Sequence, residues 1–175
     1  LAHYATLLES ASRDANVAVS RLPLLDAAER LTVLQRWNDT ARPLPAWTVP
    51  ARVLAVAAAS PAAVAVRAED ETLTYAELAR RSALVARRLE SLGVRPGDRV
   101  GVCVERSASL VPALLGVLRA GAAYVPVDAS YPAERIAHVL GDAGVRAVLT
   151  DAESAPRLPA VEAPIERIES VTWAS

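Results

Sequence analysis

The chain has 175 residues, of which 53% are hydrophobic, enough to build one core-forming domain and too many for a fully disordered protein. Its 19 basic and 20 acidic residues give a net charge of −1, and all the basic residues are arginine. This balance provides no basic stripe for a phosphate backbone, so nucleic acid is excluded as a predicted partner. The arginine bias is typical of a GC-rich bacterial genome.

Two arginine pairs, at 80–81 and 87–88, come closest to a basic cluster. They lie at helical spacing beside Glu77 and Glu90, which is typical of a solvated helix face. The sequence has no apolar run of about 18 residues and no signal peptide, so we expect no membrane partner and a cytoplasmic location.

Few residues are of the types that bind metals or act as nucleophiles. Cys103 lies in the apolar run 100–104, so we expect a buried, small hydrophobic side chain in a reducing environment. His3 and His138 are far apart in the sequence, and His138 lies on the polar side of its predicted helix. The sequence therefore predicts no metal site.

The first 50 residues predict two short helices in a proline-rich setting. One helix lies within 1–20, and another spans 26–37, with Asp26 and Glu29 at its N-terminal cap. Such short helices need a surface to pack on, so we expect a connector that is docked on a neighbouring domain. The apolar side chains expected on these helices are Leu1, Tyr4, Leu7, Leu8, Leu31, Leu34 and Trp37.

From residue 51 the pattern becomes that of a folded domain. A helix over 51–59 leads to a strand over 63–66, and a charged turn joins this strand to 73–74 in a predicted hairpin. The helix that follows is the clearest in the chain. Thr74 and Glu77 form its capping box, and a glycine ends it.

Alternating strands and helices then predict the fold class. They are a strand over 99–105, a helix over 107–120, a strand over 123–127, a helix opened by Pro132 and a strand over 146–150. This order predicts an α/β fold with a parallel, mixed-edge sheet and helices on both faces, preceded by the docked helical linker. The first strand is apolar on both faces, as in a strand buried between two helical layers.

Two details of the predicted sheet region stay open. Pro112 is expected to kink its helix unless that helix begins near Ser109. The tail at 165–173 is a candidate for one more strand.

The sequence contains little that points to catalysis. Its glycines lie at helix ends and predict C-caps and turns, and it has no glycine-rich phosphate loop or hydrolase serine motif. Of the carboxylates Asp128, Glu134 and Asp142, Asp128 is the best candidate because α/β proteins bind ligands at strand carboxyl ends. Bracing the turn before Pro132 is nevertheless its favoured role. We assign no catalytic, cofactor-binding or metal-binding residue.

Four segments resemble a known family. LTYAEL at 73–78 and RAGAAYVPVD at 119–128 resemble the first two core motifs of nonribosomal peptide synthetase adenylation domains, which are adenylate-forming ligases. YPAERI at 131–136 and VLT at 148–150 follow the same family pattern. The two motifs look architectural, and the strand around Tyr124 is expected to be buried.

Two upstream segments are similar to the region that precedes such a domain. Residues 22–40 are similar to the linker between a condensation and an adenylation domain, and 1–20 resemble the last helix of the condensation domain. The resemblance therefore implies a condensation-domain helix at 1–20, a linker at 21–50 and an incomplete adenylation domain at 51–175.

The resemblance implies that the complete protein is an ATP-dependent ligase. Such a domain activates an amino acid as aminoacyl-AMP and loads it on the phosphopantetheine arm of a carrier protein. ATP and Mg²⁺ are implied for the complete domain, and the implied partners are the condensation domain, the rest of the adenylation domain and the carrier protein. The family's phosphate loop, amino-acid pocket and catalytic lysine follow the region matched here, so this segment is expected to be scaffold and linker, inactive alone.

The sequence departs from the family pattern at 49–54, at Ala62 and at Pro112. These departures indicate a divergent domain. Two other functions stay open: a truncated docking or scaffold protein without activity, and a ligase for fatty or aryl acids, against which the linker at 22–40 argues.

An incomplete sheet leaves an edge and an apolar helix face open, so we expect the isolated chain to aggregate or dimerise.

Overall fold

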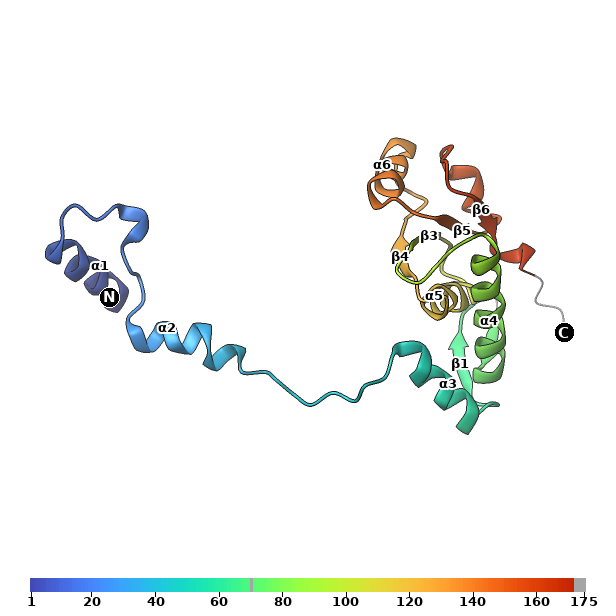
Figure 1. Cartoon of the computed structure of the whole chain (residues 1–175), viewed down its shortest axis with the longest axis horizontal. Helices are drawn as coiled ribbons and strands as arrows, with labels where there is room; N and C mark the ends of the chain where they lie inside the picture. Colours follow the sequence, from blue (N-terminus) through green and yellow to red (C-terminus); the bar gives the residue numbers. More distant parts are fainter. Residues whose placement is uncertain (70, 172–175) are drawn as a thin grey trace. The chain divides into compact units, whose positions relative to one another are not determined.

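The computed structural model describes residues 1–69 and 71–171 (Figure 1). The chain divides into two compact units, Leu1–Ala46 and Trp47–Ser175. This division falls inside the segment 21–50, which the sequence predicts to be a linker. The domain boundaries expected after residues 20 and 50 stay predictions.

The first unit contains two short α-helices, as predicted. Its elements are α1 (Ala2–Arg13), η1 (Val19–Arg21), α2 (Ala27–Leu34) and η2 (Arg36–Asn38). The Asp26 carboxylate caps α2 by accepting the backbone N–H groups of Ala28 and Glu29, both at 2.8 Å. α2 ends earlier than the predicted residue 37 because the Asn38 amide donates to the carbonyl of Val33 at 2.8 Å and closes the last turn.

Apolar side chains of the first unit face solvent. None of its described residues is buried, and Leu31, Leu34 and Trp37 are 43%, 55% and 71% exposed. A helix pair without a core gains little from the hydrophobic effect. The docking of this unit on a neighbouring domain stays a prediction.

The second unit begins with a helix and a hairpin. α3 spans Val49–Ala59, and the antiparallel strands β1 (Val64–Arg67) and β2 (Thr72–Thr74) form a separate two-stranded sheet. The hairpin is therefore confirmed, although its strands do not join the edge of the larger sheet.

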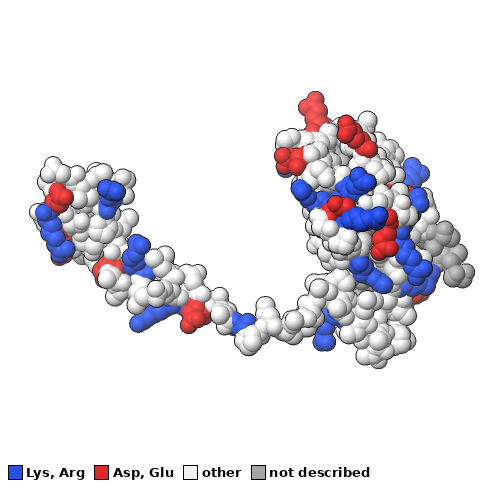
Figure 2. Space-filling model, in the orientation of Figure 1, with Lys and Arg blue, Asp and Glu red and all other residues white. Residues whose placement is uncertain are grey.

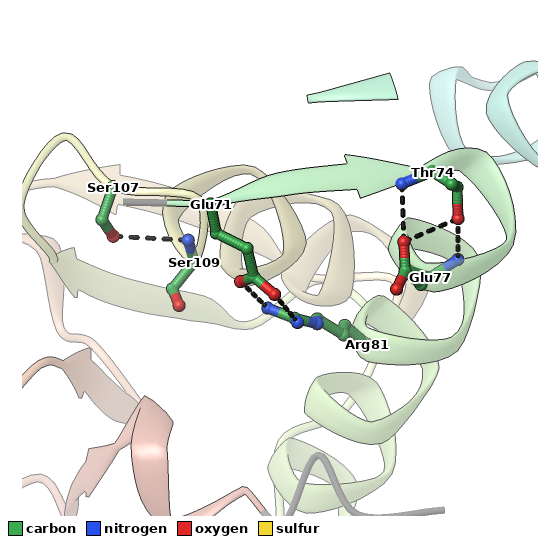
Figure 3. A network of polar contacts seen from close by, with 6 residues as sticks. All are labelled: Glu71, Thr74, Glu77, Arg81, Ser107 and Ser109. Carbon is green, nitrogen blue, oxygen red and sulfur yellow. Dashed lines mark hydrogen bonds and ion pairs between the residues drawn. The ribbon is translucent and has the colours of Figure 1, made fainter. Parts of the chain in front are cut away.

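Helix α4 (Tyr75–Ser91) has the capping box that the sequence predicts (Figure 3). The Thr74 hydroxyl accepts the backbone N–H of Glu77 at 3.3 Å, and the Glu77 carboxylate accepts the backbone N–H of Thr74 at 2.7 Å. Gly93, with φ of 84°, follows the helix as its predicted terminator.

A four-stranded sheet forms the centre of the second unit. Its strands are β3 (Arg99–Cys103), β4 (Ala123–Pro126), β5 (Ala147–Thr150) and β6 (Ile165–Arg167). Their order is β4-β3-β5-β6, and all neighbours are parallel. The predicted α/β fold with a parallel sheet is confirmed, but the predicted mixed edge is wrong, because the antiparallel hairpin forms its own sheet. β6 occupies part of the candidate tail strand, whose last residues lie outside the described residues.

Helices cover both faces of the sheet, as predicted. α4 and α5 (Leu110–Arg119) pack on one face, against side chains such as Val100 and Leu149. α6 (Ala133–Ala143) packs on the other face, where Ile136 and Leu140 share a core cluster with Cys103 and Val148. Successive residues of β3 and β5 point to opposite faces, so the buried residues 100–103 and 147–149 are apolar or small on both faces.

Helix α5 begins at Leu110, so Pro112 lies in its first turn. Proline has no N–H, but the N–H groups in the first turn of a helix have no intrahelical acceptor. Pro112 therefore removes no hydrogen bond from within α5, so it does not kink the helix. The short elements η3 (Ala155–Arg157) and η4 (Ile168–Ser170) complete the second unit.

The prediction that the strand around Tyr124 is buried is wrong, because no residue of β4 is buried. Tyr124 is 42% exposed because β4 is an edge strand with no strand on its outer side. A strand with one neighbour keeps one side of its backbone and part of its side chains in contact with solvent.

The predicted solvated face of α4 is confirmed for Arg80, Arg87 and Arg88, which are exposed, but not for Arg81. Arg81 is 8% exposed, and its guanidinium makes two bonds to the Glu71 carboxylate, which joins the hairpin to α4 (Figure 3). Arg88 likewise bonds to the buried Glu166 of β6 at 2.9 Å. On the face shown in Figure 2, arginines and acidic residues are interspersed over this unit.

Candidate functional site

The carboxyl ends of β3, β4 and β5 meet at one edge of the sheet, where α/β proteins place their ligand sites. A small pocket of about 200 Å³ opens at this edge. Its lining residues are Val104, Glu105, Arg106, Val127, Asp128, Ala129 and Ser154. We call it the strand-end pocket.

Asp151 fixes two walls of the strand-end pocket. It directly follows β5 and is 8% exposed. One carboxylate oxygen accepts the backbone N–H of Glu105 at 2.6 Å, and the other accepts that of Ser154 at 2.7 Å. A buried carboxylate with two N–H donors therefore ties the loop after β3 to the loop after β5. Asp151 was not among the predicted candidates, although an acidic residue directly after a buried strand was a usable indication.

Asp128, the best sequence candidate, does line the pocket. Its carboxylate accepts the backbone N–H of Ser130 at 2.8 Å, at the turn before Pro132. Hydrogen bonds from the hydroxyl and the backbone N–H of Ser130 hold the pKa of Asp128 below its ordinary value. The bracing role favoured by the sequence is confirmed.

Cys103 lies at the end of β3 and is fully buried, as predicted. Burial raises the pKa of its thiol to about 11, and the nearby Asp151 carboxylate acts in the same direction. The thiol is therefore protonated near neutral pH, and a protonated, buried thiol is a poor nucleophile.

The remaining candidates are not among the residues that line the strand-end pocket. His138, Glu134 and Asp142 are exposed on α6, whereas His3 bonds to Glu29 of α2 at 3.0 Å within the first unit. Among the described residues, no group of three or more His, Cys, Asp and Glu side chains is placed to hold a metal ion. No helix in the described part of the chain is both long and apolar enough to cross a bilayer.

The strand-end pocket does not fit a nucleotide. Its volume of about 200 Å³ is below the range of about 300–1,000 Å³ typical of small-molecule sites. Glu105 and Asp128 line it, and their negative charges repel phosphate groups, with Arg106 as the one cationic lining residue. ATP therefore requires residues other than those of this pocket.

Comparisons with known proteins agree with the fold and with the motifs. A subunit of linear gramicidin synthase from Brevibacillus parabrevis is 44% identical over 161 residues, which cover 91% of this chain and 3% of that protein. AmbB of Pseudomonas aeruginosa, an antimetabolite synthetase, is 45% identical over 157 residues, which cover 89% of this chain and 12% of that protein. This chain therefore spans only a small part of these relatives.

Among solved structures, the AMPPNP-bound form of the nonribosomal peptide synthetase FmoA3 matches with a TM-score of 0.76 and 33% identity, covering 98% of this chain and 20% of that one. The family model described as AMP-binding enzyme matches residues 53–174. Taken with the parallel sheet and the two motifs, these matches show that the chain belongs to the AMP-binding enzyme family and corresponds to the N-terminal portion of a nonribosomal peptide synthetase adenylation domain.

Proposed function

We propose that this chain is part of a synthetase that activates an amino acid, with 1–20 as the last helix of a condensation domain and 21–50 as the linker to the adenylation domain. The observation that carries this proposal is the reach of the match to the linear gramicidin synthase of Brevibacillus parabrevis. Because it covers 91% of the chain, it includes most of the first unit as well as the second. This reach supports our placing the upstream helices in the same synthetase as the sheet.

In the complete domain, a carboxylate oxygen of the amino acid attacks the α-phosphorus of ATP, and the bond to pyrophosphate breaks. A carrier-protein phosphopantetheine would supply the thiol that takes the acyl group, with AMP as the leaving group. The strand-end pocket is too small and too acidic for ATP and Mg²⁺, and we assign their binding to the rest of the domain. The AMPPNP in the FmoA3 structure supports the choice of nucleotide. We place the complete protein in the cytoplasm.

This chain contributes the scaffold of that domain. α4 and α5 on one face and α6 on the other hold β3, β4 and β5 in register, and Asp151 sets the loops at their carboxyl ends. None of its described side chains has a catalytic role in this proposal.

An aryl acid is the second candidate substrate. The N-terminal subdomain of NpsA from Klebsiella oxytoca, solved with 3-hydroxybenzoyl-AMSN, matches with a TM-score of 0.65 and 25% identity. That match covers 74% of this chain, compared with 98% for FmoA3. The wider coverage favours a synthetase with the upstream helices, and hence an amino acid.

ATP–pyrophosphate exchange tests the proposal. The complete protein that contains this sequence is expected to exchange labelled pyrophosphate with at least one amino acid, whereas the 175-residue chain alone gives none. A panel of benzoic and fatty acids serves as the matched control. Exchange by the isolated chain, or exchange driven only by the control acids, contradicts the proposal. Binding to a condensation domain without any exchange by the complete protein favours the docking function instead.

A further inference from the structure

Two arginines lie close together where α4 and α5 pack side by side (Figure 1). Arg119, at the end of α5, donates from Nη1 to the Ala79 carbonyl at 2.6 Å and to the Ser82 hydroxyl at 2.9 Å. Along α4, Ala79, Ala83 and Arg87 follow one another at spacings of four, so each is a neighbour of the next. Helical side chains lean toward the N-terminus of their helix, which directs the Arg87 guanidinium toward Arg119. We call these two residues the arginine pair.

The arginine pair has no anionic partner among the described residues, where neither guanidinium forms an ion pair. Arg87 is exposed, whereas Arg119 is partly buried and its Nε and Nη2 groups have no acceptor in the described part of the chain. Burial lowers the pKa of Arg119, and the charge of Arg87 acts in the same direction. Two like charges close together, one of them partly removed from water, cost free energy that a carboxylate between them would offset.

Apolar surface surrounds the arginine pair. Ala83 lies beside Arg87 and Leu118 precedes Arg119, and both are partly buried. Val111, seven residues before Leu118 and hence on the same stripe of α5, is 39% exposed. A phosphate group would leave this apolar surface in water, whereas an acidic side chain on a folded segment would arrive with residues that cover it. The surroundings therefore favour a protein carboxylate over a nucleotide.

We propose that the arginine pair binds one Asp or Glu side chain from the part of the adenylation domain outside this chain. This inference rests on the proposed function. Nε and Nη2 of Arg119 form the fork that binds both oxygens of a carboxylate, and Arg87 supplies a second positive charge. The match to FmoA3 covers only 20% of that chain, so most of such a protein lies outside this segment. A carboxylate of the same polypeptide reaches the pair at a higher effective concentration than one from a second copy.

Charge reversal tests the inference in the 175-residue chain and in the complete protein. Arg87→Glu alters the charges and the helix propensity within α4 equally in both, so the difference between the two Tm shifts reports on the added carboxylate. We expect Arg87→Glu to lower the Tm of this domain by about 4 °C more in the complete protein, because two carboxylates then repel each other. Arg99→Glu, at an exposed arginine of β3 outside the pair, should shift Tm equally in both. Equal shifts for Arg87→Glu overturn the proposal.

Labelling with phenylglyoxal, which modifies arginine, gives a second measurement on the unaltered proteins. Mass spectrometry of peptides should show that Arg119 reacts at least about 10-fold more slowly in the complete protein than in the 175-residue chain. Protection that appears only with ATP assigns the anion to the nucleotide and overturns the proposal. Protection of the isolated chain that rises with its concentration assigns the carboxylate to a second copy and also overturns it.

Pyrophosphate exchange on the same samples separates this inference from the proposed function. Slow labelling of Arg119 together with the Tm difference, but without exchange, refutes the proposed function alone. Exchange without either effect refutes the inference alone.

Discussion

Gly116 lies where α5 crosses α4, and the two helices are too close there for a side chain. A Cβ at this position would lie 2.5 Å from Val85 Cβ and 3.1 Å from the Ser82 carbonyl oxygen. We expect Gly116→Ala to lower the free energy of unfolding by about 1–3 kcal/mol, because both helices must shift. Urea unfolding followed by circular dichroism measures the change.

Gly141→Ala is the matched control for this substitution. Gly141 lies in α6, and a Cβ there meets nothing within 4 Å. Alanine favours helix more than glycine, so this variant is expected to gain up to about 1 kcal/mol. Equal losses in the two variants would show that helix packing is not the cause.

The capping box of α4 makes the free energy of unfolding depend on pH in the acid range. Hydrogen bonds from the backbone N–H and hydroxyl of Thr74 hold the pKa of Glu77 below its ordinary value. The folded state therefore favours the ionised carboxylate of Glu77, which stabilises the fold. This stabilisation is fully present above the ordinary pKa of a glutamate and is lost as the pH falls through the lowered pKa of Glu77. Glu77→Gln is expected to flatten the acid limb of the stability curve, measured as urea midpoints from neutral to acid pH. An unchanged slope would contradict this.

At the scale of elements, local patterns in the sequence were sufficient for most of the fold. Apolar periodicity and the caps at Asp26 and Thr74 depend only on nearby residues, and they placed the helices and strands of both units. Tyr124 and Arg81 were misjudged because their exposure depends on contacts with other elements. An edge position for β4 and a Glu71 partner for Arg81 follow from tertiary structure, which periodicity does not encode.

The candidate site was only partly predictable for the same reason. Asp128 was recognised because its bracing role is local, through Ser130. Asp151 acts across 46 residues, on the backbone of Glu105, and no spacing rule reveals such a contact.

The largest loss of stability that we expect from a single substitution is at Asp151. Asp151→Ala leaves the N–H groups of Glu105 and Ser154 without their acceptor, so we expect a loss of about 3 kcal/mol. Asp128→Ala, which removes an exposed contact, should cost less than about 1 kcal/mol. Both are measured by urea unfolding, and comparable losses would refute the bracing role of Asp151.

At the scale of the whole chain, the two units differ in how they are stabilised. The second unit has clusters of buried residues on both faces of its sheet, whereas the described residues of the first unit include none that is buried. Local opening is easiest where few apolar contacts must be broken.

Hydrogen exchange should therefore separate the units in the isolated chain. Amides of α1 and α2 are expected to exchange at least about 100-fold faster than those of β3 and β5 at the same pH and temperature. Mass spectrometry of peptic fragments gives both rates in one experiment. Protection of α1 equal to that of β3 would mean that another surface covers the first unit.

The lone thiol gives this protein an intrinsic probe of its own opening. Cys103 is fully buried at the carboxyl end of the inner strand β3, and its pKa of about 11 keeps it unreactive while β3 stays in place. A maleimide dye added at neutral pH would consequently modify only molecules whose sheet has come apart. Pulse labelling of the unaltered polypeptide can thus time sheet rupture without an engineered tag.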